Sequence, residues 1–144
     1  MDISDTDLAW AAGFIDGEGC IALVHHKQNI KGKVYESFVL RLSVANTDAL
    51  CLDRLKTMFG GSINSSNRAS RPHHKPCWVW YCQSAKAEVA LQKLMPFLFS
   101  KKTQAQLGIT SRKYIQSHAR LRDPVEFEKQ RGIYNNLKLM KRAA

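Results

Sequence analysis

Residues 11–19, Ala-Ala-Gly-Phe-Ile-Asp-Gly-Glu-Gly, are the stretch that decides the fold. The preceding residues 4–7, Ser-Asp-Thr-Asp, have the S-x-x-D form that begins many helices. We therefore expect a helix over residues 8–16, which the glycines at 17 and 19 bring to an end. A stripe of small residues at spacing i, i+3, i+4 and i+7 marks one side of it and permits close approach of a second helix. The stripe consists of Ala9, Ala12, Gly13 and Asp16.

Two strands and a second helix are predicted after this motif. Residues 20–24 favour a short strand, Gly32 marks a loop, and residues 37–45 alternate with a period of two. Phe38, Leu40, Leu42 and Val44 then point to one side, where they would cover a core. Thr47 is the expected cap of a helix that runs to Phe59, before the glycines at 60 and 61.

The second half of the chain repeats the strand pair and ends in helices. Residues 62–66 and 77–82 are the expected strands, joined by the basic segment 67–76. Trp78 and Trp80 are assigned to the core side, although the opposite phase would turn them toward a ligand. Ser84 is the expected cap of a helix that Pro96 ends or kinks. Further helices are predicted from Lys101 to about residue 118, and after an Asp123-Pro124 cap.

This order of elements predicts an α+β fold of the form αββαββα, with an antiparallel sheet covered by helices on one side. The length of 144 residues fits one domain, with a core over about residues 5–118 and a helical extension over about residues 119–144. The uncovered face of the sheet is therefore available to bind a partner.

The charge distribution indicates what that partner is. The formal net charge is +10, and between Arg54 and Arg122 the only acidic residue is Glu88. Such a surface attracts a polyanion, with release of counterions from phosphates as the driving force. The absence of a signal sequence or an apolar span and the irregular spacing of four cysteines favour a soluble, intracellular protein with reduced thiols.

Residues 11–19 resemble the LAGLIDADG signature, with Ala11 at its first position and Glu18 as its second acid. The spacing of the predicted elements over residues 8–107 is also similar to that of the family. The resemblance implies a homing endonuclease with a saddle-shaped DNA-binding sheet. Such an enzyme cuts both strands of a long, near-palindromic DNA target.

The resemblance also assigns roles at the active site. Asp16 and Glu18 are separated by roughly 200° on a helix, so they cannot face the same site. Glu18 matches the metal-binding acid of the family, with a carbonyl oxygen near Gly19 as a further ligand for Mg²⁺. Asp16 is either a structural, capping carboxylate or part of the small-residue stripe. In the family pattern two Mg²⁺-binding acids meet in a homodimer, each site cutting one strand.

Two further residues match catalytic positions of the family. Lys101 corresponds to the active-site lysine, which offsets phosphate charge, although Lys102 beside it is an alternative and both could be phosphate contacts. Asn46 corresponds to a polar residue that orients solvent, but a turn-forming role before Thr47 fits it equally well.

Alternation and the resemblance together predict the DNA-reading side chains. They lie on the uncovered face of the first two strands and on the second hairpin. The set is Ala22, Val24, His26, Gln28, Ser37, Val39, Arg41, Ser43, Arg68, Arg71 and Lys75.

Two alternative functions remain open from the sequence. Members of this family can act as maturases that bind an intron RNA, and a protein of this fold can bind nucleic acid without cutting it. The acid at Glu18 together with Lys101 favours the nuclease over both.

Overall fold

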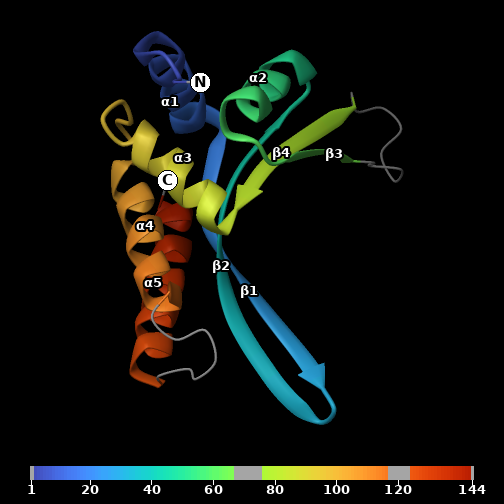
Figure 1. Ribbon diagram of the computed structural model, residues 1–144, viewed down its shortest axis with the longest axis vertical. Helices are drawn as coiled ribbons and strands as arrows, with labels where there is room; N and C mark the ends of the chain where they lie inside the picture. The colour runs from blue at the N-terminus through green and yellow to red at the C-terminus, as the bar shows by residue number, and fades with distance from the viewer. Residues whose placement is uncertain (1, 67–75, 117–123, 144) are drawn as a thin grey trace.

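The computed structural model describes residues 2–66, 76–116 and 124–143 (Figure 1). The first part of the chain forms α1 (Asp5–Glu18), β1 (Gly19–Ile30), β2 (Lys33–Asn46) and α2 (Ala49–Phe59). It continues with β3 (Ser62–Ser66), β4 (Cys77–Gln83), α3 (Ser84–Leu94), α4 (Lys102–Gln116) and α5 (Pro124–Ala143). The predicted order of helices and strands is therefore confirmed.

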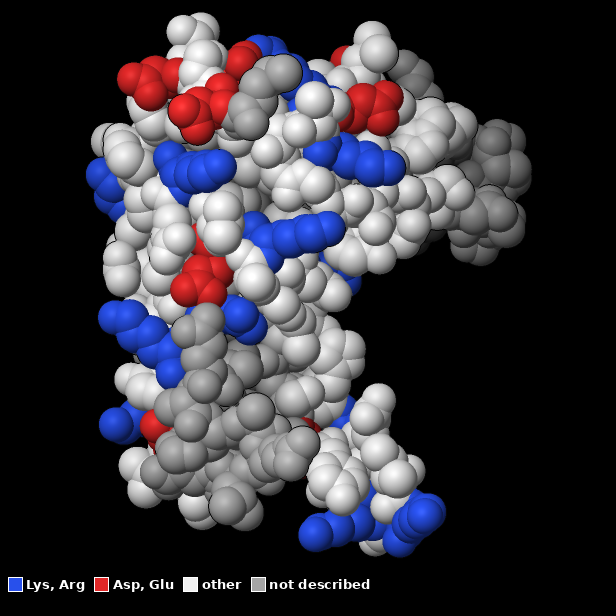
Figure 2. All heavy atoms as spheres, viewed as in Figure 1, with Lys and Arg blue, Asp and Glu red and all other residues white. Residues whose placement is uncertain are grey.

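The four strands form one antiparallel sheet in the order β1-β2-β4-β3. The long β1–β2 hairpin and the β3–β4 ribbon diverge as two arms, and the helices lie on the opposite side of the sheet (Figure 1). A space-filling view shows the hollow between the two arms (Figure 2). This is the α+β arrangement predicted from the sequence.

The core lies between the sheet and the helices. Phe38, Leu40, Leu42 and Val44 are each at most 1% exposed, as the alternation of β2 predicts. Trp80 is fully buried and Trp78 packs against the core, so the inward assignment of both tryptophans is confirmed. In the part of the sheet next to the helices, every second residue of β2 thus faces the core, and the other set faces away from the helices.

The first two strands are longer than predicted. Their extensions pair residue for residue out to Ile30 and Lys33, and Lys31 and Gly32 both adopt positive φ angles in the two-residue turn. Most of this distal part is exposed on both faces. Because it leaves the core, its sequence lacks the apolar alternation on which the prediction relied.

The helix caps correct three details of the prediction. Asp48, not Thr47, caps α2 by accepting a hydrogen bond from the backbone of Leu50 at 3.0 Å. Ser84 is the first residue of α3, with a φ of 55°, and Gln83 precedes it without a side-chain cap. The helix that was expected to begin at Lys101 begins one residue later. The predicted cap at Asp123 lies outside the described residues.

The cysteines are present as thiols, as their irregular spacing predicts. All four cysteines are free, and burial raises the pKa of the Cys82 thiol to about 12, so this side chain is a neutral part of the core. Among the described residues, no helix is long and apolar enough to cross a membrane.

Candidate active site and nucleic-acid interface

The motif ends in an abrupt change from helix to strand. Glu18 is the last residue of α1 and Gly19 is the first of β1. A Cβ atom on Gly19 would lie 2.8 Å from both Cγ2 and the carbonyl oxygen of Ile15, a distance that real side chains do not reach. Only glycine therefore lets the strand leave the helix at this point, and this turn holds the exposed Glu18 at the base of the helix.

Three hydrogen bonds connect the last turn of α1 to the segment before α4. The carboxylate of Asp16 accepts from the backbone N–H groups of Phe99 at 2.8 Å and Lys101 at 3.0 Å. In return, Nζ of Lys101 donates to the carbonyl oxygen of Asp16 at 2.6 Å. We call these three bonds the Asp16–Lys101 clamp. They give Asp16 the structural, capping role that was one of its two interpretations.

The clamp distinguishes the two candidate lysines. Lys101 is partly buried, and its ammonium group lies at the carboxyl end of α1, where the helix dipole favours a cation. Lys102 is exposed and is the first residue of α4. Lys101 is therefore the lysine that the fold fixes next to the motif.

Asn46 has a turn-forming role in the structure. Its side-chain oxygen accepts a hydrogen bond from the backbone N–H of Asp48 at 2.8 Å, which shapes the connection between β2 and α2. This is the local role that competed with solvent orientation in the sequence.

The donor set at the base of α1 fits a hard divalent cation. Glu18 supplies an exposed carboxylate, backbone carbonyl oxygens of the helix end are close by, and oxygen ligands are what Mg²⁺ prefers. Within the described ranges, no group of three His, Cys, Asp or Glu residues is placed to hold a metal ion. A cation here would thus need water, phosphate or a second protein chain to complete its shell.

The exposed side of α1 is smaller than predicted. Ala9 and Gly13 are exposed and Asp16 is partly exposed, but Ala12 is 0% exposed and belongs to the chain's own core. Ala12 follows Ala11 into the interior, so its assignment to the outer stripe is corrected. A Cβ atom on Gly13 would meet no atom within 4 Å, which leaves open space over this part of the helix.

The uncovered face of the sheet carries the predicted reading residues of β1 and β2. In the register, Ala22 lies opposite Arg41, Val24 opposite Val39, and His26 opposite Ser37. Gln28 and Ser43 follow in the same alternation, paired with Tyr35 and Cys20. All are partly or fully exposed, in contrast to the buried set between them. Arg68, Arg71 and Lys75 lie outside the described residues.

Two residues of β4 extend this face and were missed in the sequence. Gln83 lies directly opposite Arg41, and Tyr81 lies opposite Ser43. The guanidinium of Arg41 stacks over the Tyr81 ring at 4.4 Å from its centroid. Nε of Arg41 is buried and finds no hydrogen-bond partner in the part of the chain that the structure describes. The inward phase of Trp80 already implied the outward phase of Tyr81, so alternation alone could have found it.

Comparison with known proteins places the chain in a family. The profile described as LAGLIDADG endonuclease matches residues 11–107, which includes the motif, the sheet and Lys101. This chain therefore belongs to the LAGLIDADG endonuclease family. No curated protein matches the sequence significantly.

Solved structures share the fold at low sequence identity. The homing endonuclease I-CvuI, in complex with its target, superposes with a TM-score of 0.78 at 21% identity, over 93% of this chain and 81% of that one. An archaeal intron-encoded homing endonuclease, I-Vdi141I, in complex with DNA gives 0.72 at 19% identity, over 93% and 83%. I-SmaMI bound to cleaved DNA gives 0.66 at 19% identity, over 93% of this chain but only 45% of that one.

Proposed function

We propose that this protein is a site-specific homing endonuclease that makes a double-strand break by metal-dependent hydrolysis of phosphodiester bonds. The observation that carries the proposal is the base of α1. There the exposed carboxylate of Glu18 ends the helical turn that the Asp16–Lys101 clamp holds in place. Membership of an endonuclease family and fold similarity to homing endonucleases in complex with DNA support it.

In this proposal, Glu18 and a carbonyl oxygen near Gly19 would hold Mg²⁺, which would supply Lewis-acid polarisation of the scissile phosphate and would make a bound water more acidic. Lys101 carries a fixed positive charge at the same end of the helix and offsets the negative charge that develops on the phosphate. The bond from Asp48 uses the side-chain oxygen of Asn46, so the NH₂ of the amide is the group that would orient solvent.

The proposed active form is a homodimer. The chain contains one copy of the motif and therefore one Glu18, whereas cutting two strands requires two metal-binding acids. Ala9 and Gly13 give α1 an exposed surface without bulky side chains, so a second α1 can pack closely against it. A two-fold dimer presents the same reading face twice, which requires a near-palindromic target.

The uncovered sheet face is the proposed reading surface. An antiparallel ribbon fits the major groove, where side chains contact base edges. Arg41 is the best-placed of these residues because it lies on an inner strand and its guanidinium is oriented by Tyr81. The exposed Lys27, Lys31 and Lys33 at the end of the β1–β2 hairpin add positive charge to the same arm (Figure 2).

Selection of cut sites from a randomised DNA library, followed by plasmid cleavage with and without Mg²⁺, tests the proposal. We expect Mg²⁺-dependent linearisation of a plasmid that carries the selected site. Glu18→Gln should abolish cleavage and leave binding largely intact, because the amide keeps the shape of the side chain but loses the charge that holds the metal. Full Mg²⁺-dependent activity in this variant would refute the assignment of Glu18.

The same experiment separates the two alternatives raised by the sequence. A wild-type protein that binds DNA tightly but never cuts it is a non-catalytic binding protein. One that binds an intron RNA and promotes its splicing, with no DNA cleavage, is a maturase.

A further inference from the structure

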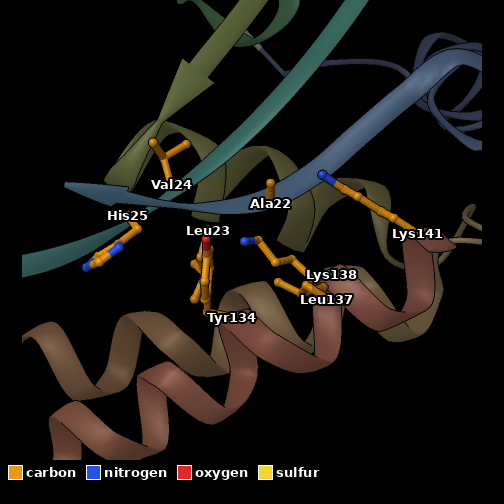
Figure 3. Close-up of a pocket in the computed structure, with 8 residues that line it drawn as sticks. All are labelled: Ala22, Leu23, Val24, His25, Tyr134, Leu137, Lys138 and Lys141. Carbon is orange, nitrogen blue, oxygen red and sulfur yellow. The ribbon is translucent and has the colours of Figure 1, made fainter.

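A pocket of about 400 Å³ lies between the edge strand β1 and the last turns of α5 (Figure 3). Residues of β1 line one side of it and residues of α5 the other. The residues that matter here are Ala22, Val24 and His25 of β1, and Tyr134, Lys138 and Lys141 of α5.

The lining of this pocket is basic. Two lysines and a histidine line it, and none of its lining residues is acidic. Nζ of Lys138 lies over the Tyr134 ring at 4.5 Å from the centroid, so an aromatic contact supports the lysine chain. Nε2 of His25 is buried and has no hydrogen-bond partner among the described residues, and Oε2 of Glu36 lies 3.8 Å from it. These features suit an anion.

The pocket opens at the border of the proposed reading face. β1 is an outer strand of the sheet, and Ala22 and Val24 point to the uncovered side, opposite Arg41 and Val39. In Figure 3, Lys141 extends from α5 up to the level of β1, while Leu23 and His25 point down toward the helix. A strand of nucleic acid that crosses the reading face and passes the β1 edge thus comes within reach of the α5 lysines.

We infer that Lys138 and Lys141 form a site that binds phosphates of the DNA backbone beyond the β1 edge of the sheet. The inference rests on the proposed function and extends the DNA interface from the sheet to α5. Ammonium groups bind phosphate oxyanions as point charges without reading bases, so this site adds affinity and orientation, not sequence preference.

Helix stability offers a competing explanation for the same lysines. Cations near the carboxyl end of a helix offset its dipole, and residues 129–144 contain five Lys or Arg and no acid. That explanation predicts a change in thermal stability but none in DNA binding, so the two can be separated by experiment.

The test measures DNA affinity against salt concentration for the double variant Lys138→Gln with Lys141→Gln. Fluorescence anisotropy with a labelled duplex that carries the selected target, in EDTA so that no strand is cut, reports binding alone. Each phosphate contact contributes about 0.9 to the slope of log affinity against log salt. We expect the slope to fall by about 2 per protomer, with a cleavage rate at saturating DNA within about twofold of wild type.

Two control variants test whether the effect depends on the position of the lysines and on their charge. Lys86→Gln with Lys93→Gln removes the same charge from α3, in a groove beside α2, and should leave the slope nearly unchanged. Lys138→Arg with Lys141→Arg keeps the charge and should bind like wild type. Circular dichroism melting shows whether a loss of DNA affinity arises from unfolding. The Arg variant then shows whether positive charge at these two positions is enough to keep the affinity.

The possible outcomes separate this inference from the function on which it rests. A wild-type protein that binds no duplex overturns the proposed function. A wild type that binds and cuts, with a Gln variant of unchanged slope, overturns the phosphate site alone. An equal fall of the salt slope in the α3 control would mean general charge attraction and would overturn the phosphate site. Loss of RNA binding by the Gln variant without loss of DNA affinity would assign the pocket to RNA and would also overturn the site.

Discussion

The base of α1 and the distal half of the β1–β2 hairpin are separated only by the first residues of β1, but they differ in how firmly the fold holds them. At the base of α1, Ile15 is fully buried and Asp16 makes two hydrogen bonds through its carboxylate. In the hairpin, residues 26–35 are all exposed, and backbone pairing between two strands is the main contact that orders them.

This difference corresponds to two requirements of the proposed function. Hydrolysis requires a few groups at fixed positions, where a misplacement of about 1 Å slows the reaction strongly. Recognition of a long duplex requires many contacts that adjust to DNA shape, so a less tightly packed arm is suitable. Variants that disrupt one of these regions can therefore show how far the other depends on it.

The largest effect is expected at Gly13, on the exposed side of α1. Gly13→Leu should prevent dimerisation and so abolish double-strand cleavage, because close helix packing leaves no room for the larger side chain. The protomer should stay folded, since a Cβ atom there meets nothing within 4 Å and leucine favours helix. Sedimentation, together with plasmid cleavage, measures both outcomes.

Gly132→Leu is the matched control for this prediction. Gly132 is also exposed on a helix, and a Cβ atom there likewise meets nothing within 4 Å, but it lies in α5. This variant should remain dimeric and active. A wild-type monomer that cuts both strands of an asymmetric target would refute the dimer.

The next effect concerns the Asp16–Lys101 clamp. Lys101→Met should slow cleavage at saturating DNA by about 10²–10³-fold with little loss of affinity. Asp16→Asn should slow it by about tenfold, because the amide offers one acceptor where the two backbone N–H groups of Phe99 and Lys101 need two.

A double-mutant cycle distinguishes positioning from general structural damage. If Asp16 acts by placing Lys101, then Asp16→Asn should cause no further slowing in a Lys101→Met background. Multiplicative losses in the double variant would instead mean that the two residues act separately. Equal losses of binding and rate in Lys101→Met would favour a simple phosphate contact.

A smaller effect is expected in the reading face, at the Arg41–Tyr81 stack. Tyr81→Ala should weaken discrimination at the base pair that Arg41 contacts by about 2–5-fold, the value of an exposed cation–π contact. Cut-site selection from a library measures this, and Tyr81→Phe, which keeps the ring, should behave like wild type. Reduced turnover with unchanged sequence preference would show that the stack does not serve recognition.

Much of the fold was predictable because caps and alternation patterns in the local sequence indicate where helices and strands lie. Ser4 accepts the expected cap bond from Asp7, and the alternation of β2 gives its buried face directly. The clamp was not predictable, because its bonds join residues more than 80 positions apart and so depend on tertiary packing. Helical spacing alone could not determine which face of α1 the core takes, and therefore Ala12 was misplaced.

The smallest effect is expected where α5 meets the β1–β2 hairpin. Burial of Glu36 opposes its charged form, but a hydrogen bond from Arg131 at 3.0 Å and nearby cations outweigh burial and lower the pKa of Glu36. A lowered pKa stabilises the fold above the ordinary glutamate pKa, and this contribution is lost as the pH falls through the folded-state value.

Glu36→Gln should therefore lower Tm slightly at neutral pH, and the difference from wild type should vanish in strong acid. Thermal melts across the acidic range measure it. A difference that persists unchanged at the lowest pH would indicate that Glu36 contributes through packing instead of charge.

The open strand edges of the sheet have a consequence for handling and engineering. Within the described ranges, no strand pairs with the outer edge of β1 near Ile30, and such open edges promote aggregation. Lys27, Lys31 and Lys33 place charge along this hairpin and discourage edge-to-edge association. Variants that replace these lysines to alter target preference will therefore lose solubility unless other charges are added to the hairpin.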